Sequence, residues 1–204
     1  MKKITTSVST RTFNRVPASW SKEIETILIT ESDLAERVKN LAQQIERDYV
    51  GKEMVIVSLL NGTVMFLGDL IRNISLPLRL DFIGVSSYGA GTESGDLVFT
   101  KELRIDVQGR HVLLVDDILD TGRTLHRVLL KLKKLKPREI KTCVLLDKKE
   151  RRVEKVEADY VGFSIPNHFV VGYGLDYAER YRNLPFVGVL KAERYKKEHC
   201  HGKK

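Results

Sequence analysis

The feature that most constrains the fold of this chain is the segment from Arg110 to Leu125, which reads R-H-V-L-L-V-D-D-I-L-D-T-G-R-T-L. Its apolar, β-branched run from Val112 to Val115 is typical of a strand buried on both faces. Beyond the polar residues that follow, leucines and a valine recur at spacings of three and four, as on the buried side of an amphipathic helix. A strand, a polar loop and a helix in this order predict that the loop lies at the carboxyl edge of a parallel sheet, where open α/β folds bind ligands.

The residues of this loop are suited to an anion that lies beside a sugar. The segment Asp120–Thr124 supplies consecutive backbone N–H groups, two threonine hydroxyls and the positive end of the following helix, which suits one phosphate. Gly122 allows a left-handed backbone and a close approach of the ligand. Asp116, Asp117 and Asp120 would repel a phosphate unless they face sugar hydroxyls or a Mg²⁺ ion masks their charge. A phosphorylated sugar meets these requirements; the alternative is a solvated turn whose Asp residues only cap the helix.

Hydrophobic periodicity predicts alternating strands and helices in the rest of the chain. Helices are expected over about 30–45, 63–74 and 125–135, and strands over 54–60, 78–86, 140–146, 160–163, 169–172 and 186–190. This alternation is typical of βαβ units and a mainly parallel sheet. We therefore predict a single α/β domain over residues 1–204, in which segments 1–30 and 185–204 are peripheral and form a small cap.

The composition indicates a soluble globular protein with a basic surface. Of the 204 residues, 42% are hydrophobic and 30% are charged, and no apolar run reaches membrane length. The N-terminus lacks the apolar stretch of a signal peptide, so we expect a cytoplasmic protein with no membrane partner. A net charge of +8 is compatible with nucleic acid or with steering of polyanionic substrates. His199-Cys200-His201 lacks a complete set of metal ligands at established spacings.

The chain resembles the hypoxanthine-guanine phosphoribosyltransferases from about Leu59 to Arg182. Four pieces carry the resemblance: Leu60-Asn61-Gly62-Thr63, Ser87-Tyr88, the acidic loop, and the stretch from Asp159-Tyr-Val-Gly-Phe through Phe169-Val-Val-Gly-Tyr to Leu175-Asp176-Tyr177. The resemblance implies the type I phosphoribosyltransferase fold, a mainly parallel twisted sheet flanked by helices with a small hood from the terminal segments. It also implies purine salvage: 5-phosphoribosyl-1-diphosphate and hypoxanthine or guanine would give IMP or GMP plus pyrophosphate, in a homodimer or homotetramer.

For the sugar phosphate, the resemblance assigns roles to the acidic loop. Asp116 and Asp117 would accept hydrogen bonds from the ribose hydroxyls, directly or through Mg²⁺ and its water. The 5-phosphate would be held by the residues Asp120, Thr121, Gly122, Arg123 and Thr124. Asp120 would also act as the general base or acid at purine N7.

For pyrophosphate and the second metal ion, the resemblance implicates residues from both ends of the matched region. Asn61 and Gly62 match a loop that contacts pyrophosphate and often contains a cis peptide bond. Many relatives have a basic residue where this chain has Asn61, so backbone N–H donation alone is expected there. Arg182 would bind pyrophosphate oxygens through its guanidinium fork. Asp176, grouped with the purine-binding residues, would contact a second Mg²⁺ or its waters.

Purine recognition would come from residues later in the chain. Lys148 matches the lysine that donates to a 6-oxo group, and a 6-amino purine would present a donor in that place. Lys149 is adjacent, but the eleven-residue offset to Asp159 favours Lys148. Phe169 would stack on the purine plane, and Val170 would offer main-chain groups to the base edge. Ser87-Tyr88 and the glycine-rich loop 89–95 resemble a lid that excludes water.

Two other functions are compatible with parts of the sequence. A regulatory RNA-binding protein built on the same fold would account for the basic surface, but it has no need of a nearly complete set of substrate residues. A phosphoribosyltransferase that prefers xanthine differs at contacts to the purine 2-position, which are largely backbone contacts. A pyrimidine or adenine enzyme would not be expected to carry the Lys148 and Phe169 segments.

Overall fold

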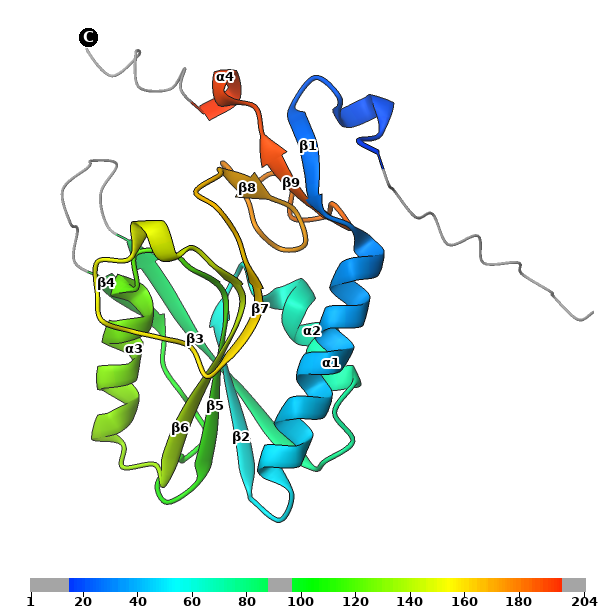
Figure 1. Cartoon of the computed structure of the whole chain (residues 1–204). Coiled ribbons are helices and arrows are strands. Elements are labelled where there is room, and N and C mark those ends of the chain that lie inside the picture. Colours follow the sequence, from blue (N-terminus) through cyan, green and yellow to red (C-terminus); the bar gives the residue numbers. More distant parts are fainter. Residues whose placement is uncertain (1–14, 88–96, 196–204) are drawn as a thin grey trace, which may run out of the picture.

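A computed structural model describes residues 15–87 and 97–195, and its centre is a twisted six-stranded sheet (Figure 1). The strand order is β4-β3-β2-β5-β6-β7, and every neighbouring pair is parallel except β3 and β4. The strands are β2 (Met54–Leu60), β3 (Leu78–Ser87), β4 (Leu97–Lys101), β5 (His111–Leu119), β6 (Glu139–Asp147) and β7 (Tyr160–Ser164). The predicted mainly parallel sheet is confirmed.

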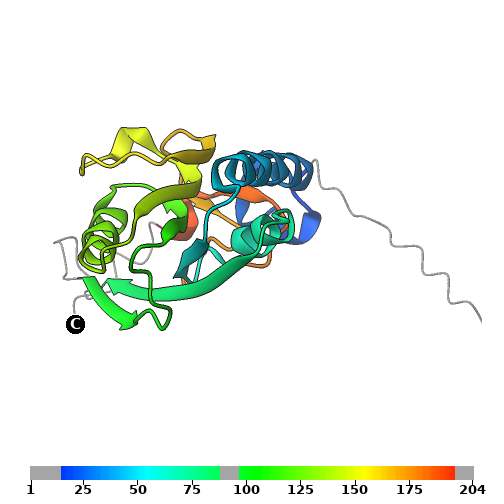
Figure 2. The same ribbon diagram turned by 90° about the horizontal axis from the view of Figure 1, so that it is seen from below.

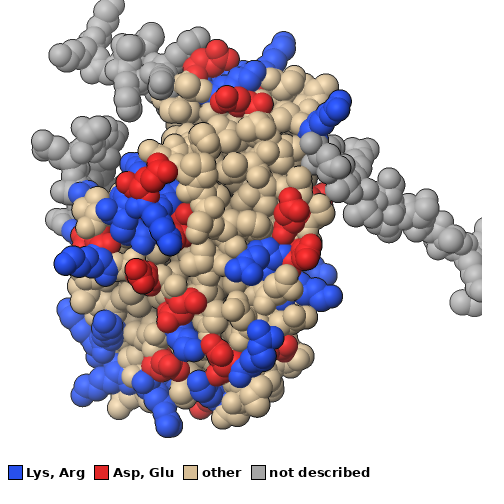
Figure 3. All heavy atoms as spheres, viewed as in Figure 1, with Lys and Arg blue, Asp and Glu red and all other residues tan. Residues whose placement is uncertain are grey.

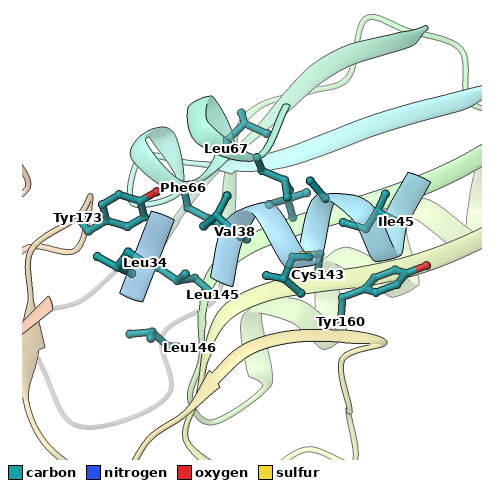
Figure 4. Close-up of a cluster of buried hydrophobic side chains, with 14 of the residues drawn as sticks. Leu34, Val38, Ile45, Phe66, Leu67, Cys143, Leu145, Leu146, Tyr160 and Tyr173 are labelled. Atoms are coloured by element: carbon teal, nitrogen blue, oxygen red, sulfur yellow. The ribbon is translucent and has the colours of Figure 1, made fainter. Parts of the chain in front are cut away.

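Helices cover both faces of this sheet, so its central strands are apolar on both sides. The helices α1 (Glu31–Tyr49) and α2 (Val64–Arg72) lie on one face and α3 (Arg123–Lys134) lies on the other (Figures 1 and 2). In β2, Met54 and Ile56 pack in the cluster under α1 and α2, whereas Val55 and Val57 pack in the cluster under α3. Figure 4 shows the first cluster, in which α1 side chains such as Val38 meet Cys143 of β6. The alternation follows from the two-residue period of a strand.

The helix α1 begins where its sequence places a capping box. The Thr30 hydroxyl accepts a hydrogen bond from the Asp33 N–H at 3.2 Å, and the Asp33 carboxylate accepts one in return from the Thr30 N–H at 3.4 Å. These bonds satisfy N–H groups that have no partner within the helix. Of the two expected caps, Thr30 and Ser32, the structure selects Thr30.

A second, smaller sheet forms a hood over the carboxyl ends of the large one (Figure 1). Its antiparallel strands are β1 (Ile24–Ile29), β9 (Val187–Leu190) and β8 (Val170–Val171), in that order. The hood has its own apolar core, which includes Ile24, Tyr181 and Phe186. The short elements η1 (Ala18–Trp20) and α4 (Ala192–Tyr195) flank it. The hood thus draws on both terminal segments, as predicted, and adds β8 from the interior of the chain.

The main departure from the predicted elements concerns β5. The expected strand ends at Val115, but β5 continues to Leu119 because its pairing with β6 persists through Asp116↔Val144 to Leu119↔Asp147. The expectation that Asp116 and Asp117 lie in the loop was therefore wrong, since both belong to the strand. Strand β4 and the short helix η2 (Lys149–Arg151) were also not predicted. In the described part of the chain, no helix is both long enough and apolar enough to cross a membrane.

The buried carboxylate of Asp81 ties the edge of the sheet together. It accepts hydrogen bonds from Lys101 Nζ at 2.8 Å and from the N–H groups of Phe82, Arg104 and Ile105 at 2.8, 2.5 and 3.0 Å. Burial favours the neutral acid, but these donors outweigh it and hold the pKa of Asp81 well below its usual range. The charged form therefore joins β3 to β4 and to the segment that follows β4.

Replacing Asp81 with Asn should lower the free energy of unfolding by about 2–3 kcal/mol at pH 7, because hydrogen bonds to a charged group are lost. A carboxylate whose folded pKa is depressed contributes stability above its unfolded pKa of about 3.9 and loses it as the pH falls toward the folded value. The difference between wild type and variant should therefore narrow below about pH 4. Urea unfolding at several pH values measures it, and a difference that grows on acidification would contradict this account.

Candidate active site

A cavity of about 270 Å³ lies at the carboxyl ends of β2 and β5. The connection from β2 to β3 uses α2 on one face, and the connection from β5 to β6 uses α3 on the other, so the chain direction switches between β2 and β5. Open α/β sheets bind ligands at such a switch point. The cavity is lined by Leu59, Leu60, Gly62, Val85, Asp116, Asp117, Ile118, Leu119, Asp120, Thr121, Gly122, Thr124 and Leu125.

The loop after β5 presents its backbone and the start of α3 to this cavity. Gly122 is the N-cap of α3 and has a φ of +84°, a left-handed conformation that favours glycine. Thr121, Gly122 and Thr124 line the cavity, whereas the side chain of Arg123 is exposed. The positive end of a twelve-residue helix therefore faces a polar pocket, an arrangement suited to a phosphate. The alternative in which Asp120 only caps the helix loses its basis, because the cap is Gly122 and makes no side-chain hydrogen bond.

Asp116 and Asp117 form an acidic pair on β5, in which Asp116 is buried and Asp117 is half-buried. Burial raises the pKa of the Asp116 carboxyl well above its usual range, and the adjacent Asp117 carboxylate raises it further. Burial also raises the pKa of Asp117, although the charge of Arg182 acts in the opposite direction. The Ile118 N–H donates to Asp117 Oδ1 at 2.8 Å and orients that carboxylate. Two crowded carboxyls of this kind can be stabilised in their charged form by a divalent cation or by sugar hydroxyls.

Asp120 carries an unsatisfied carboxylate oxygen. Its Oδ2 lies 3.2 Å from Arg151 Nη1, but Oδ1 is buried and no hydrogen-bond partner reaches it among the residues that the structure describes. An unpaired buried oxygen is energetically costly, so its presence calls for an explanation. Asp120 lines the cavity at the start of the segment 120–124 that follows β5, which we call the phosphate-type loop because it is suited to a phosphate. Because its side chain is 29% exposed and lines this cavity, the Asp120 carboxylate can accept a proton or a hydrogen bond from a molecule bound there.

Lys148 lies at the end of β6, close to Asp120. Its residue surface is only 5% exposed, whereas the neighbouring Lys149 is exposed, which separates two lysines that look equivalent in sequence. Burial lowers the pKa of the Lys148 ammonium and the nearby Asp120 carboxylate opposes this effect. The Lys148 N–H donates to the Leu119 carbonyl at 3.0 Å, so the backbone of Lys148 is joined to the end of β5. A buried ammonium with few local partners is suited to donating to a carbonyl group of a ligand.

Phe169 belongs to an exposed aromatic cluster rather than to the core. Its surface is 36% exposed, its ring stacks on Tyr195 of α4 with centroids 4.5 Å apart and planes inclined by 15°, and Tyr177 meets it edge-on at 5.5 Å. Val170 follows in β8 and is buried. A large, partly exposed ring held in position by other rings is suited to stacking on a planar ligand.

The turn after β2 is enclosed by two distant parts of the chain. The Leu60-Asn61 peptide bond is cis, as the resemblance implied. A Cβ added to Gly62 would overlap with the Asp117 carboxylate, and one added to Gly174 would overlap with the Gly62 carbonyl oxygen. Arg182 Nη1 in turn donates to the Gly174 carbonyl at 2.9 Å. The predicted pyrophosphate residues Asn61, Gly62 and Arg182 are therefore close together, because Gly174 lies against Gly62 and accepts a hydrogen bond from Arg182.

Comparison with known proteins agrees with this geometry. The phosphoribosyl transferase domain family matches residues 27–178, and the chain is 46% identical to the hypoxanthine-guanine phosphoribosyltransferase of Streptococcus thermophilus over 86% of this chain and 98% of that protein. The chain belongs to the hypoxanthine-guanine phosphoribosyltransferase family. A hypoxanthine phosphoribosyltransferase structure from Staphylococcus aureus superposes with a TM-score of 0.84 at 44% identity and covers 88% of this chain and 98% of that one. A Listeria monocytogenes bifunctional TilS/HprT protein is 46% identical over 87% of this chain, but the chain spans only 28% of its length.

The roles expected for Asp176 and for the Ser87-Tyr88 lid are not tested by the described residues. Asp176, which was expected to contact a second Mg²⁺ or its waters, has its Oδ1 3.0 Å from Arg182 Nη2. Over residues 15–87 and 97–195, no three His, Cys, Asp or Glu side chains form a ready-made metal site. Ser87 ends β3, whereas Tyr88 and the glycine-rich loop 89–95 lie outside the described residues.

Residues that the sequence analysis did not single out also contact the candidate site residues in this structure. Arg151 contacts Asp120, Gly174 supports Gly62, and Tyr195 stacks on Phe169. The glycine pair in Gly172-Tyr-Gly174 was a usable signal, because glycines directly after a strand mark a close backbone approach. Arg151 lies in a basic run that is typical of solvated surface, and nothing in the neighbouring sequence distinguishes it from the rest of that run.

Proposed function

We propose that this protein transfers the 5-phosphoribosyl group from 5-phosphoribosyl-1-diphosphate to hypoxanthine or guanine, giving IMP or GMP plus pyrophosphate in purine salvage. The observation that carries the proposal is the position of the Asp120 carboxylate in the cavity beside a phosphate-type loop and close to the buried Lys148. A carboxylate that accepts from the ring and an ammonium that donates to its carbonyl match the edge of a 6-oxopurine.

In this proposal, the cavity residues act on the bond that changes. A ring nitrogen of the purine forms a bond to the anomeric carbon as the bond from that carbon to pyrophosphate breaks. Thr121, Gly122 and Thr124 would hold the 5-phosphate, with Arg123 contributing through its N–H. Asp120 would take the N7 proton that the purine loses, an effect worth about 10²–10⁴-fold in rate.

Mg²⁺ fits the acidic pair on β5. The pKa values of Asp116 and Asp117 are both raised by burial, and a divalent cation would stabilise their charged forms. We propose that this pair holds Mg²⁺ through the ribose hydroxyls or water, and that Asp176 contacts a second ion through its waters. When bound, the metal neutralises charge on the departing pyrophosphate. Asn61, Gly62 and Arg182 would contact that pyrophosphate from the other side.

The purine would lie between the phosphate-type loop and the hood. We propose that the face of Phe169 that Tyr195 leaves uncovered stacks on the base, and that Val170 main-chain groups meet its edge. The Lys148 ammonium then faces the 6-position. With adenine, a donor would meet this donor, and leaving a buried donor unpaired costs about 1–3 kcal/mol, or roughly 10–10²-fold in affinity.

Nucleotide formation from each base tests the proposal. We expect product from hypoxanthine and guanine, a kcat/KM for adenine lower by about 10²-fold, and loss of activity when a chelator removes Mg²⁺. Xanthine is the informative comparison, because faster turnover with xanthine would favour the xanthine-preferring alternative. Faster turnover with adenine or uracil than with hypoxanthine would overturn the proposal.

The RNA-binding alternative, a regulatory protein built on the same fold, is supported in this chain by its basic surface. Figure 3 shows Lys and Arg side chains gathered along the side of the molecule that carries α3, whose last turn contains Lys131, Lys133 and Lys134. A basic helix face is common on soluble proteins and also attracts polyanionic substrates. We therefore propose small-molecule substrates rather than nucleic acid. From the resemblance to the family, we also propose a homodimer or homotetramer, and from the N-terminal sequence a cytoplasmic location.

A further inference from the structure

Arg152 makes an unusual set of contacts beneath the loop that follows β5. Its Nε donates to the Asp120 carbonyl at 3.0 Å, and its Nη2 donates to the Leu119 carbonyl at 3.2 Å. Nη2 also pairs with the Asp147 carboxylate at the end of β6, and Nη1 donates to the Val156 carbonyl at 2.5 Å. One guanidinium therefore joins β5, β6 and the segment after η2, and its side chain is only 17% exposed.

The backbone around Arg152 adds to these contacts. The Thr121 carbonyl accepts hydrogen bonds from both the Val153 and Glu154 N–H groups, at 2.9 and 3.1 Å. The stem of Arg152 also lies against Gly122, since a Cβ added to Gly122 would come within 3.0 Å of the Arg152 Cδ. The carbonyls of Leu119, at the end of β5, and of the next two residues all accept hydrogen bonds from the segment 152–154, whereas residues 119–122 also line the cavity.

The same segment begins at Lys148. Its N–H donates to the Leu119 carbonyl, which Arg152 also contacts. Arg152 therefore lies where the proposed purine-recognition lysine and the proposed catalytic carboxylate are joined through the main chain. Only an arginine has the fork of five N–H donors that can satisfy several acceptors at once, and a lysine at this position could not reach all of them.

We propose that Arg152 is a positioning residue that fixes residues 119–122, from the end of β5 into the loop, and with them the Asp120 carboxylate, relative to Lys148. It contacts neither substrate, and it acts through the carbonyls that it holds. The proposal rests on the proposed transfer activity. Because a displacement of about 1 Å in a reacting group can cost about 10²-fold in rate, loss of the clamp should appear in turnover and not only in stability.

The test compares Arg152→Gln and Arg152→Lys with Arg37→Gln in the full chain. Arg37 is the matched control, because it too donates to two main-chain carbonyls, those of Val161 and Gly162 at 2.6 and 2.7 Å, but on β7 away from the cavity. We expect both Arg152 variants to lose tenfold or more in kcat, with a raised KM for 5-phosphoribosyl-1-diphosphate. Arg37→Gln should lower the melting temperature and leave kcat within twofold of wild type.

Chemical rescue separates positioning from a loss of folded protein. Millimolar guanidinium added to Arg152→Ala should restore part of kcat, whereas it should not restore Asp120→Asn. Arg152→Lys keeps a positive charge next to Asp147, so it still provides a test of the proposal if the other Arg152 variants fail to fold. A fall in kcat smaller than tenfold in folded Arg152→Lys and Arg152→Gln would overturn the proposal. If wild type itself makes no nucleotide, the proposed function fails instead, so the two failures are distinguishable.

Discussion

Replacing Asp120 with Asn is expected to lower kcat with hypoxanthine by about 10²–10⁴-fold, the usual contribution of a general acid or base. Asn cannot take up a proton, yet it keeps the size of the side chain and one acceptor oxygen. The Asp120 carboxylate, which lines the cavity and is 29% exposed, is the group that we expect to face purine N7. Since the phosphate would be held by the backbone of the loop, the affinity for 5-phosphoribosyl-1-diphosphate should stay within about threefold of wild type.

Steady-state kinetics and calorimetry with 5-phosphoribosyl-1-diphosphate and Mg²⁺ measure the two quantities separately. Asp106→Asn is the matched control, because Asp106 is an exposed residue whose carboxylate accepts only a local bond from the Gln108 N–H at 3.0 Å. It should behave as wild type. Retained turnover in Asp120→Asn would remove Asp120 from the catalytic role, whereas lost turnover together with lost sugar-phosphate binding would indicate a role in holding the loop.

Replacing Gly174 with Ala should damage both stability and substrate binding. Gly174 has a φ of +99°, which non-glycine residues rarely adopt, and an added Cβ would overlap with the Gly62 carbonyl oxygen. A strained backbone of this kind costs about 1–3 kcal/mol, which lowers the melting temperature by roughly 2–12 °C in a chain of this size. Relief of the overlap must move the Gly62 turn, which lies against the Asp117 carboxylate.

The displaced turn should lower kcat/KM for 5-phosphoribosyl-1-diphosphate by about 10²-fold, because pyrophosphate would lose its backbone donors. Differential scanning calorimetry and initial-rate kinetics provide the two readouts. Gly68→Ala is the control: Gly68 lies within α2, and an added Cβ would meet no atom within 4 Å. That change should raise stability by about 0.5–1 kcal/mol. If Gly174→Ala instead keeps wild-type kinetics, the turn is not held by this contact.

The chemistry of the site was largely readable along the chain wherever the contributing residues are neighbours. The run from Asp116 to Thr124 carries its acids, its glycine and its helix start within nine residues, so its spacing alone indicates a phosphate beside a sugar. The buried strands and amphipathic helices followed from periodicity for the same reason. The end of β5 did not, because only the partner strand β6 shows that pairing continues to Leu119.

Contacts between distant residues had to come from the folded chain. Lys148 and Lys149 are alike in sequence, and only the packing around the end of β6 buries one and exposes the other. Phe169 looks like a core residue by type, and only the fold shows that its ring is 36% exposed and lies against Tyr195 and Tyr177. Arg152 contacts carbonyl groups more than thirty residues earlier in the chain, and a carbonyl carries no side-chain signature. Short-range order is encoded in residue type and spacing, whereas burial and main-chain partnership depend on which segments the sheet topology brings together.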